Sequence, residues 1–232
     1  TARWHEFDYG EPSVQPPSII EQLDEELRRA VTRRLQADVP VGAYLSGGLD
    51  SSSIAALAAS QAQSPLRTFS ITFDRPEYDE STFQRLAAQT LGTAHEIESI
   101  GDGAIARIFP DVISHAETPM VRTAPAPLFL LSRLARRNGI KVVLTGEGAD
   151  EIFLGYDLFK ETALREFCAR EPESTRRPQL FKRLYPYLAG SRGGELWPKF
   201  FLSAGDRCDP LFSHQPRILL TSWIKQLYSP DF

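Results

Sequence analysis

The sequence contains no long apolar run and no large excess of charge of one sign. No stretch approaches the roughly eighteen consecutive apolar residues that a membrane-spanning helix needs. The formal net charge of −4 gives no electrostatic basis for binding nucleic acid. A basic segment followed by an apolar one, as in a secretion signal, does not open the sequence. We therefore expect a cytoplasmic protein with no membrane and no nucleic-acid partner.

Cysteine and histidine are also scarce. The two cysteines, Cys168 and Cys208, could form one disulfide, but free thiols in a reducing cytosol fit the rest of the sequence better. The four histidines are scattered without the spacing of metal ligands. A metal site built from cysteine and histidine is therefore not expected.

The hydrophobic pattern alternates between strands and helices over the middle of the chain. Short β-prone apolar segments predict strands, and amphipathic segments between them predict helices. The predicted strands cover 41–45, 66–73, 94–97 and 140–144, and helices are predicted after the glycine turn at 46–52 and over 81–91, 101–115 and 128–137. This alternation indicates an α/β fold whose mostly parallel sheet carries helices on both faces. In such sheets, ligands bind outside the carboxyl ends of the strands.

The segments on either side of this region are less regular. Residues 1–17, with prolines and aromatic residues but no core pattern, predict an arm or linker. A helix follows, with Ser18 as its N-cap and Glu21 completing a capping box. We expect one domain over residues 18–165 and an irregular helical extension over 166–232, where prolines and glycines interrupt the helical pattern.

One stretch indicates a site for an anion. The strand 41–45 leads into Ser46-Gly47-Gly48-Leu49-Asp50-Ser51-Ser52, and a helix-forming segment follows. Glycines let the backbone approach a ligand closely, and free N–H groups at a helix start favour a negative group. Asp50 would repel a phosphate unless Mg²⁺ lies between them. The alternative is an ordinary glycine turn before a helix that Asp50 or Ser51 caps.

A second acidic, glycine-rich turn follows the last predicted strand. Thr145-Gly146-Glu147-Gly148-Ala149-Asp150-Glu151 continues into Ile152-Phe153-Leu154-Gly155-Tyr156. Glu147 lies between two glycines at the expected crevice, and Asp150 begins a helical turn. Because both turns leave carboxyl ends of strands, Asp50 and Asp150 can flank Mg²⁺ ions that bind the β- and γ-phosphates of a nucleotide. Alternatively, Asp150 and Glu151 only stabilise a helix N-terminus.

These motifs resemble those of a known family. The string from Ser46 to Ser52 is not the common P-loop, which needs G-x-x-x-x-G-K followed by Ser or Thr. It resembles the pyrophosphate-binding loop of the N-type ATP pyrophosphatases, which split ATP into AMP and pyrophosphate. With the second turn and the segment A-P-L-F-L-L-S-R, Ala126–Arg133, it resembles the synthetase domain of the glutamine-hydrolysing asparagine synthetases, over about Ile19–Arg170. The resemblance implies an adenine nucleotide alpha hydrolase-like fold that uses ATP and Mg²⁺.

The resemblance also implies roles for individual residues. Glu147 matches the family's residue at the reaction intermediate, where it would take a proton from attacking ammonia. Asp50 and Asp150 would hold the metal. Arg122 is either a contact to substrate or phosphate or an ordinary exposed loop arginine. The residues expected around ATP are Tyr44, Leu45, Ile71, Thr145 and Gly146 at the adenine, and Ser46, Gly47, Gly48, Asp50 and Ser51 at the phosphates.

The implied reaction is ATP-dependent formation of an amide. The β-carboxylate of aspartate attacks the α-phosphate to give β-aspartyl-AMP and pyrophosphate, and ammonia then displaces AMP to yield asparagine. Glutamate at position 147 favours ammonia chemistry, since the β-lactam-forming relatives carry tyrosine there. The alternatives are a related amidotransferase acting on another carboxylate and a non-catalytic nucleotide-binding fragment.

The sequence departs from the family in two respects. It begins at Thr1, whereas the family's glutaminase domain begins with a nucleophilic cysteine, so we expect a glutaminase domain upstream to supply ammonia from glutamine. The family's pyrophosphate-contacting lysine has no counterpart, since Lys225 is not in a similar context. We therefore expect a piece of a larger protein that does not hydrolyse glutamine by itself. Two questions stay open: whether this piece is active by itself, and whether it forms a homodimer.

Overall fold

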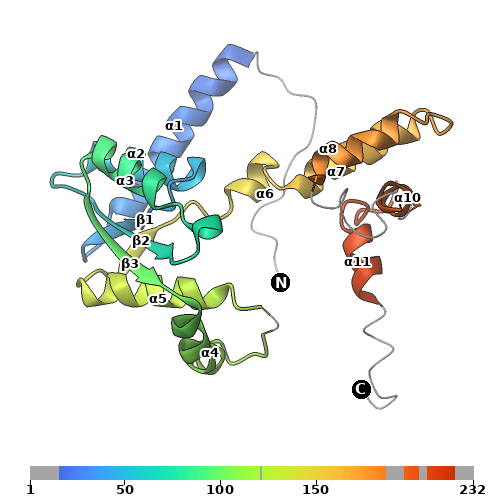
Figure 1. Ribbon diagram of the computed structural model, residues 1–232. Coiled ribbons are helices and arrows are strands. Elements are labelled where there is room, and N and C mark those ends of the chain that lie inside the picture. Colours follow the sequence, from blue (N-terminus) through green and yellow to red (C-terminus); the bar gives the residue numbers. More distant parts are fainter. Residues whose placement is uncertain (1–15, 121, 187–195, 204–207, 223–232) are drawn as a thin grey trace, which may run out of the picture. The chain divides into compact units, whose positions relative to one another are not determined.

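The computed structural model describes residues 16–120, 122–186, 196–203 and 208–222. The chain divides into two compact units, Thr1–Glu147 and Gly148–Phe232. Within the described residues, the first unit holds all the strands and the second is helical (Figure 1). The predicted arm, residues 1–17, falls almost wholly outside the described residues, as does Lys225.

The elements follow one another in a simple order. The first unit contains α1 (Pro16–Leu35), β1 (Val41–Tyr44), α2 (Leu49–Gln61), β2 (Arg67–Phe73), the 3-10 turn η1 (Pro76–Tyr78), α3 (Ser81–Leu91), β3 (Ala94–Ile100), α4 (Asp102–Ala116), α5 (Pro125–Arg137) and β4 (Val142–Leu144). The second contains α6 (Ala149–Phe153), α7 (Asp157–Ala169), the 3-10 turn η2 (Arg177–Leu180), α8 (Phe181–Leu184), α10 (Trp197–Ser203) and α11 (Gln215–Ser222).

The strands form one parallel sheet in the order β3-β2-β1-β4. The chain passes from β1 outward to β2 and β3, and then returns to the other side of β1 with β4. The direction of winding therefore reverses between β1 and β4, and such a switch point leaves a crevice outside the carboxyl ends of the two strands. The loops after β1 and after β4 both start at this edge.

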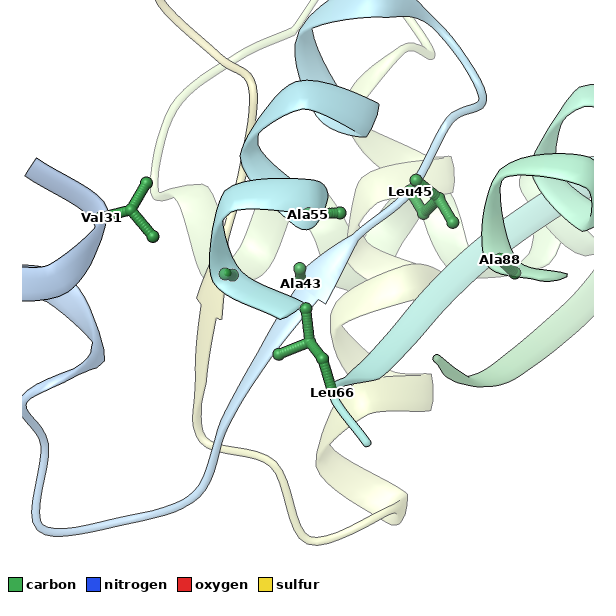
Figure 2. Packing of buried hydrophobic residues seen from close by; sticks show 7 residues of the cluster. Val31, Ala43, Leu45, Ala55, Leu66 and Ala88 are labelled. Carbon is green, nitrogen blue, oxygen red and sulfur yellow. The ribbon is translucent and has the colours of Figure 1, made fainter. Parts of the chain in front are cut away.

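Helices α1, α2 and α3 cover one face of the sheet. Their buried side chains, Val31, Ala55 and Ala88, pack with Ala43 and Leu45 at the end of β1. Figure 2 shows Leu45 between α2 and α3, where the strand turns into its loop. The alanines let the helices approach the sheet closely, so the start of α2 is held near the end of β1.

Helices α4 and α5 cover the opposite face (Figure 1). Ile108 of α4 and Leu130 of α5 pack against Ile71 and Ile100 of the sheet. Phe69, which is fully buried in β2, packs in a neighbouring cluster with the end of α5. Helices on both faces of a parallel sheet confirm the predicted α/β class.

Several boundaries differ from the predictions, and each difference has a physical reason. Helix α1 begins at Pro16, so Ser18 lies inside the first turn and is not the N-cap; proline suits a first turn because its φ is already helical. For the same reason α5 begins at Pro125 and not at Leu128. Strand β3 extends to Ile100 because it pairs with β2 along its whole length.

The apolar run at 140–144 predicts a strand, and such a run is typical of a buried one. The observed strand is shorter, Val142–Leu144, and Val142 is 38% exposed. Within the described residues β4 pairs only with β1, so it is an edge strand. Apolar composition alone does not distinguish an edge strand from a central one.

The second unit is organised around a buried carboxylate. Glu161 of α7 is 0% exposed and accepts hydrogen bonds from Tyr185 Oη at 2.7 Å and from Arg217 Nη1 at 2.5 Å. Burial and the bond to Glu161 raise the pKa of the Tyr185 hydroxyl far above its ordinary value. Arg165 donates to the carbonyl of Phe212 at 2.6 Å and stacks over its ring. These polar contacts tie α7 to α11 and to the segment after α8.

A bilayer-spanning helix is not found among the residues that the structure describes, because none of their helices is both long and apolar enough.

Two leucines of α5 test the packing of this helix on the sheet. Leu130 is 2% exposed, whereas Leu128 is 50% exposed. Leu130→Ala should lower the free energy of unfolding by about 2–5 kcal/mol, because it leaves a cavity against Ile71. Leu128→Ala should change it by about 0.5 kcal/mol or less. Urea unfolding followed by circular dichroism measures both, and equal losses would contradict this packing.

Candidate functional site

The loop between β1 and α2 closes on itself through two serine hydroxyls. The Ser46 N–H donates to Ser51 Oγ at 3.1 Å, the Gly48 N–H donates to Ser46 Oγ at 3.2 Å, and the two hydroxyl oxygens are 2.8 Å apart. Ser51 is buried, whereas Ser46 and Gly48 are exposed. The loop therefore keeps its shape through its own bonds and leaves part of its backbone open to solvent.

Gly47 holds this loop against α3. Its φ is +82°, in the left-handed region that favours glycine. A Cβ at this position would lie 2.8 Å from the backbone N of Gln84 and 2.8 Å from Cβ of Phe83. Both the conformation and the close approach therefore require glycine, and the loop rests on the first turn of α3.

Helix α2 begins without a side-chain cap. Its N-cap is Gly48, and its first backbone bond runs from the Ser52 N–H to the Gly48 carbonyl at 3.1 Å. No cap from a side chain is found for α2 among the described residues, so a helix capped by Asp50 or Ser51 is not what forms. The N–H groups of Leu49, Asp50 and Ser51 precede that first bond and lie at the positive end of the helix dipole. This helix start suits an anion.

The loop after β4 reaches the same helix start. Gly146 lies so close to α2 that an added Cβ would be 2.7 Å from the backbone N of Ser51 and 2.9 Å from the backbone C of Asp50. Thr145, its half-buried neighbour, leaves β4 beside β1. The structure thus brings Thr145 and Gly146 of the second loop close to the residues of the first loop that are expected at the phosphates.

The remaining residues expected at the adenine lie at the ends of β1 and β2. Leu45 and Ile71 are buried, with 1% and 8% of their surface exposed. Tyr44 is half-buried, and its hydroxyl lies 2.9 Å from Ser132 Oγ of α5. The Leu45 carbonyl accepts a hydrogen bond from Ser70 Oγ. These residues frame the carboxyl edge of the sheet.

The acidic residues of the second loop are divided between the units. Glu147 is exposed and ends the first unit. Asp150 belongs to the second unit, in α6, where its carboxylate occupies the space that a side chain at Gly155 would need. A metal site shared by Asp50 and Asp150 stays a prediction. Arg122 is exposed in the segment before α5, and its contact with a substrate stays a prediction too.

Sequence reasoning missed Gln84 of α3. Only 3% of the surface of Gln84 is exposed, and its Nε2 donates a hydrogen bond to the Ile71 carbonyl at 3.0 Å. The signal was the helical spacing, because Gln84 lies three residues after Ser81 and four before Ala88, and all three are buried. Ser70, which bonds the Leu45 carbonyl, was missed because a serine inside a strand carries no positional signal.

Comparison with known proteins finds a matching family model and several similar proteins, most of them named asparagine synthetase. Residues 22–209 match the family model described as asparagine synthase. Asparagine synthetase 1, glutamine-hydrolyzing, of Bacillus subtilis is 29% identical over 225 residues, which cover 94% of this chain and 34% of that protein. Asparagine synthetase 2, glutamine-hydrolyzing, of Lotus japonicus is 40% identical over 167 residues, 64% of this chain and 28% of the other. Amidase chyE of Penicillium rubens is 36% identical over 162 residues, which cover 64% of this chain and 24% of that protein.

The chain spans only part of these relatives. It covers between 24% and 34% of the length of the three proteins. The matched region is therefore about a quarter to a third of each of these proteins.

Two glycines test the contact between the second loop and α2. Gly146→Ala should lower the free energy of unfolding by about 1–3 kcal/mol, because its Cβ overlaps the backbone of the first turn of α2. Gly103→Ala in α4 is the matched control, since its Cβ meets only Arg107 Nη1 at 3.4 Å. The control should stabilise the helix by about 0.5–1 kcal/mol. Urea unfolding compares them, and an unchanged Gly146→Ala protein would contradict the contact.

Proposed function

This chain belongs to the asparagine synthase family, and we propose that it is the part of such an enzyme that uses ATP to form an amide. In the proposed reaction the side-chain carboxylate of aspartate is adenylated, and ammonia then displaces AMP to give asparagine. The observation that carries the proposal is the start of α2, which has no side-chain cap and has the backbone of Gly146 packed against its first turn.

The first loop supports binding of the phosphates. A phosphate chain needs several N–H donors and close access to the backbone, and the N–H groups of Leu49, Asp50 and Ser51 meet the first need. Gly48 meets the second, because an added Cβ there would touch only Ser46 Oγ, at 3.3 Å. Pyrophosphate, the leaving group of the reaction, would lie on this loop.

Mg²⁺ would be held with the phosphates by Asp50, and Asp150 stays a predicted second ligand. Mg²⁺ is usually coordinated by one or two carboxylates together with substrate phosphates. The ion, when bound, would stabilise negative charge on the departing pyrophosphate.

The chemistry explains why ATP is consumed. A carboxylate is a poor electrophile, so its oxygen first attacks the α-phosphorus, and the bond from that phosphorus to the bridging oxygen of pyrophosphate breaks. The nitrogen of ammonia then attacks the acyl carbon, and the bond to the AMP oxygen breaks. Glu147 would accept the proton that the attacking nitrogen loses. The N–H groups at the start of α2 would stabilise the charge that develops on pyrophosphate.

The wider assignment follows from family membership. We propose a nucleotide-binding domain over residues 18–165 with a helical extension over 166–232. An upstream glutaminase domain would supply ammonia, and the whole would act in the cytoplasm without nucleic acid or a membrane. Whether two copies associate stays open.

A second candidate is amide formation on a carboxylate other than that of aspartate. The observation that favours it is the 36% identity to amidase chyE, a relative that is not named an asparagine synthetase and is more similar to this chain than the 29% identical asparagine synthetase 1 of Bacillus subtilis. The phosphate loop would serve both reactions equally, so the substrate acid distinguishes them.

Exchange of labelled pyrophosphate into ATP tests the first half-reaction. Exchange should depend on L-aspartate. Asp50→Asn should reduce it by about 100-fold, because an amide holds Mg²⁺ more weakly than a carboxylate and the charge on the phosphates is then less well neutralised. Asp111→Asn, an exposed position in α4, is the control and should match the wild type. Exchange that requires another acid would favour the second candidate. If the protein neither catalyses the exchange nor binds ATP, the proposal as a whole is contradicted.

Glu147→Gln separates the two half-reactions. If Glu147 accepts the proton of ammonia, amide formation from added ammonium should fall by about 100-fold or more, while aspartate-dependent exchange should change much less. Asparagine can be quantified by mass spectrometry in the same samples. An equal loss of exchange and amide formation would place Glu147 in the adenylation step instead.

A further inference from the structure

A cavity opens at the amino edge of the sheet, whereas the candidate anion site lies at the carboxyl edge. Its volume is about 450 Å³, and it is partly open to solvent. Because the strands are parallel, the segments that lead into β1, β2 and β4 meet at this edge. The lining residues come from 35–41 before β1, from 61–67 before β2, and from Ile140 before β4. A cavity of this size can hold a small organic molecule.

Much of the lining is apolar. Leu66 and Ile140 are buried, with 5% and 3% of their surface exposed, and Leu35 and Val41 are half-buried. Figure 2 shows Leu66 at the start of β2, in the same cluster as Ala43. Apolar side chains around a concave site favour an apolar group of a ligand, because both then lose contact with water. A ligand of this cavity should therefore have an apolar body.

One charged side chain belongs to the lining. Arg67 is half-buried, and it is the only charged residue among those that line the cavity. Its Nη1 donates to the Asn138 carbonyl at 2.8 Å, and its Nη2 donates to Asn138 Oδ1 at 2.7 Å. The guanidinium also lies over the Phe69 ring, 5.9 Å from its centre. These contacts fix the position of the guanidinium before any ligand arrives.

The charge of Arg67 is not neutralised by a carboxylate of the chain. Within the residues that the structure describes, Arg67 forms no ion pair. A guanidinium also has more N–H donors than its two bonds to Asn138 use. Such a planar group binds carboxylates well, since two of its N–H groups can donate to the two oxygens together.

The polar residues beside Arg67 also favour an anion. Gln61 Oε1 accepts a hydrogen bond from Thr32 Oγ1, so the amide nitrogen of Gln61 stays available as a donor. Ser64, which is exposed, adds a hydroxyl. The lining residues include no Asp or Glu, so a cationic ligand would meet only the like charge of Arg67.

We propose that this cavity binds a small apolar molecule with a single carboxylate, which pairs with Arg67 while the apolar body lies against Leu66 and Ile140. A plain carboxylic acid fits better than an amino acid, because an ammonium group would have no acidic partner in the lining. The site is distinct from the proposed nucleotide site, since the two lie at opposite edges of the sheet. The inference therefore goes beyond the proposed function and does not depend on it.

Ligand-observed NMR titration of the whole chain with three probes tests the proposal. The probes share a phenylbutyl body and differ in the head group: 4-phenylbutanoate is an anion, 4-phenylbutanamide is neutral and 4-phenylbutylamine is a cation. The carboxylate should bind with a dissociation constant of about 1 mM or lower. The amide should bind about 10-fold more weakly, because it lacks the charge that pairs with Arg67, and the amine more weakly still.

Two substitutions locate the binding. Arg67→Met keeps an apolar stem but removes the charge, so the preference for the carboxylate over the amide should fall below about 2-fold. Ser64→Trp places a large ring at the cavity from an exposed position, and should weaken 4-phenylbutanoate binding by about 10-fold or more even if Arg67→Met does not fold. Ser99→Trp, the same change at an exposed position of β3 outside the lining, should bind like the wild type.

Each contrary result overturns the inference. A wild type that does not bind 4-phenylbutanoate, or that binds the amide equally well, would show that no carboxylate is recognised. Unchanged binding by Ser64→Trp would place the molecule elsewhere. Saturation with ATP and Mg²⁺ should leave the affinity for 4-phenylbutanoate unchanged, and competition would place it in the nucleotide site instead. A protein that binds 4-phenylbutanoate but no ATP would contradict the proposed function and leave this inference intact.

Discussion

The organisation of the first unit depends on close backbone packing around the first turn of α2. Gly146 fits against the backbone of Asp50 and Ser51, and Gly47 fits against the backbone at Gln84, so neither position has room for a side chain. Three backbone segments from distant parts of the sequence meet there. Because backbone atoms are less adaptable than side chains, the arrangement fixes the helix start relative to both loops.

The packing of the sheet explains why these segments meet at this edge. Parallel strands direct all their carboxyl ends to one side, and the reversal of winding between β1 and β4 separates the helices there. Ala43 and Ala55 are fully buried and small, which lets α2 lie close to β1. The close packing of α2 on β1 therefore has two results: it buries the hydrophobic core, and it places the start of α2 at the carboxyl edge of the sheet, where the candidate anion site lies.

The alternation of strands and helices was predictable because each element carries its own local pattern. The two glycine turns were recognisable for the same reason, since their residues are consecutive. Gln84 and the exposed edge strand β4 were not predictable, because they depend on which segments become neighbours. The buried Glu161, with its partners Tyr185 and Arg217, was equally hidden, since charged residues normally indicate a solvated face.

The bonds within the β1–α2 loop affect the thermodynamics of ligand association. Ser51 Oγ accepts from the Ser46 N–H, and Ser46 Oγ accepts from the Gly48 N–H, with no ligand involved. The conformational entropy of this loop is thus lost when the protein folds and is not lost again on association. A preorganised loop of this kind can contribute affinity for even a small anion.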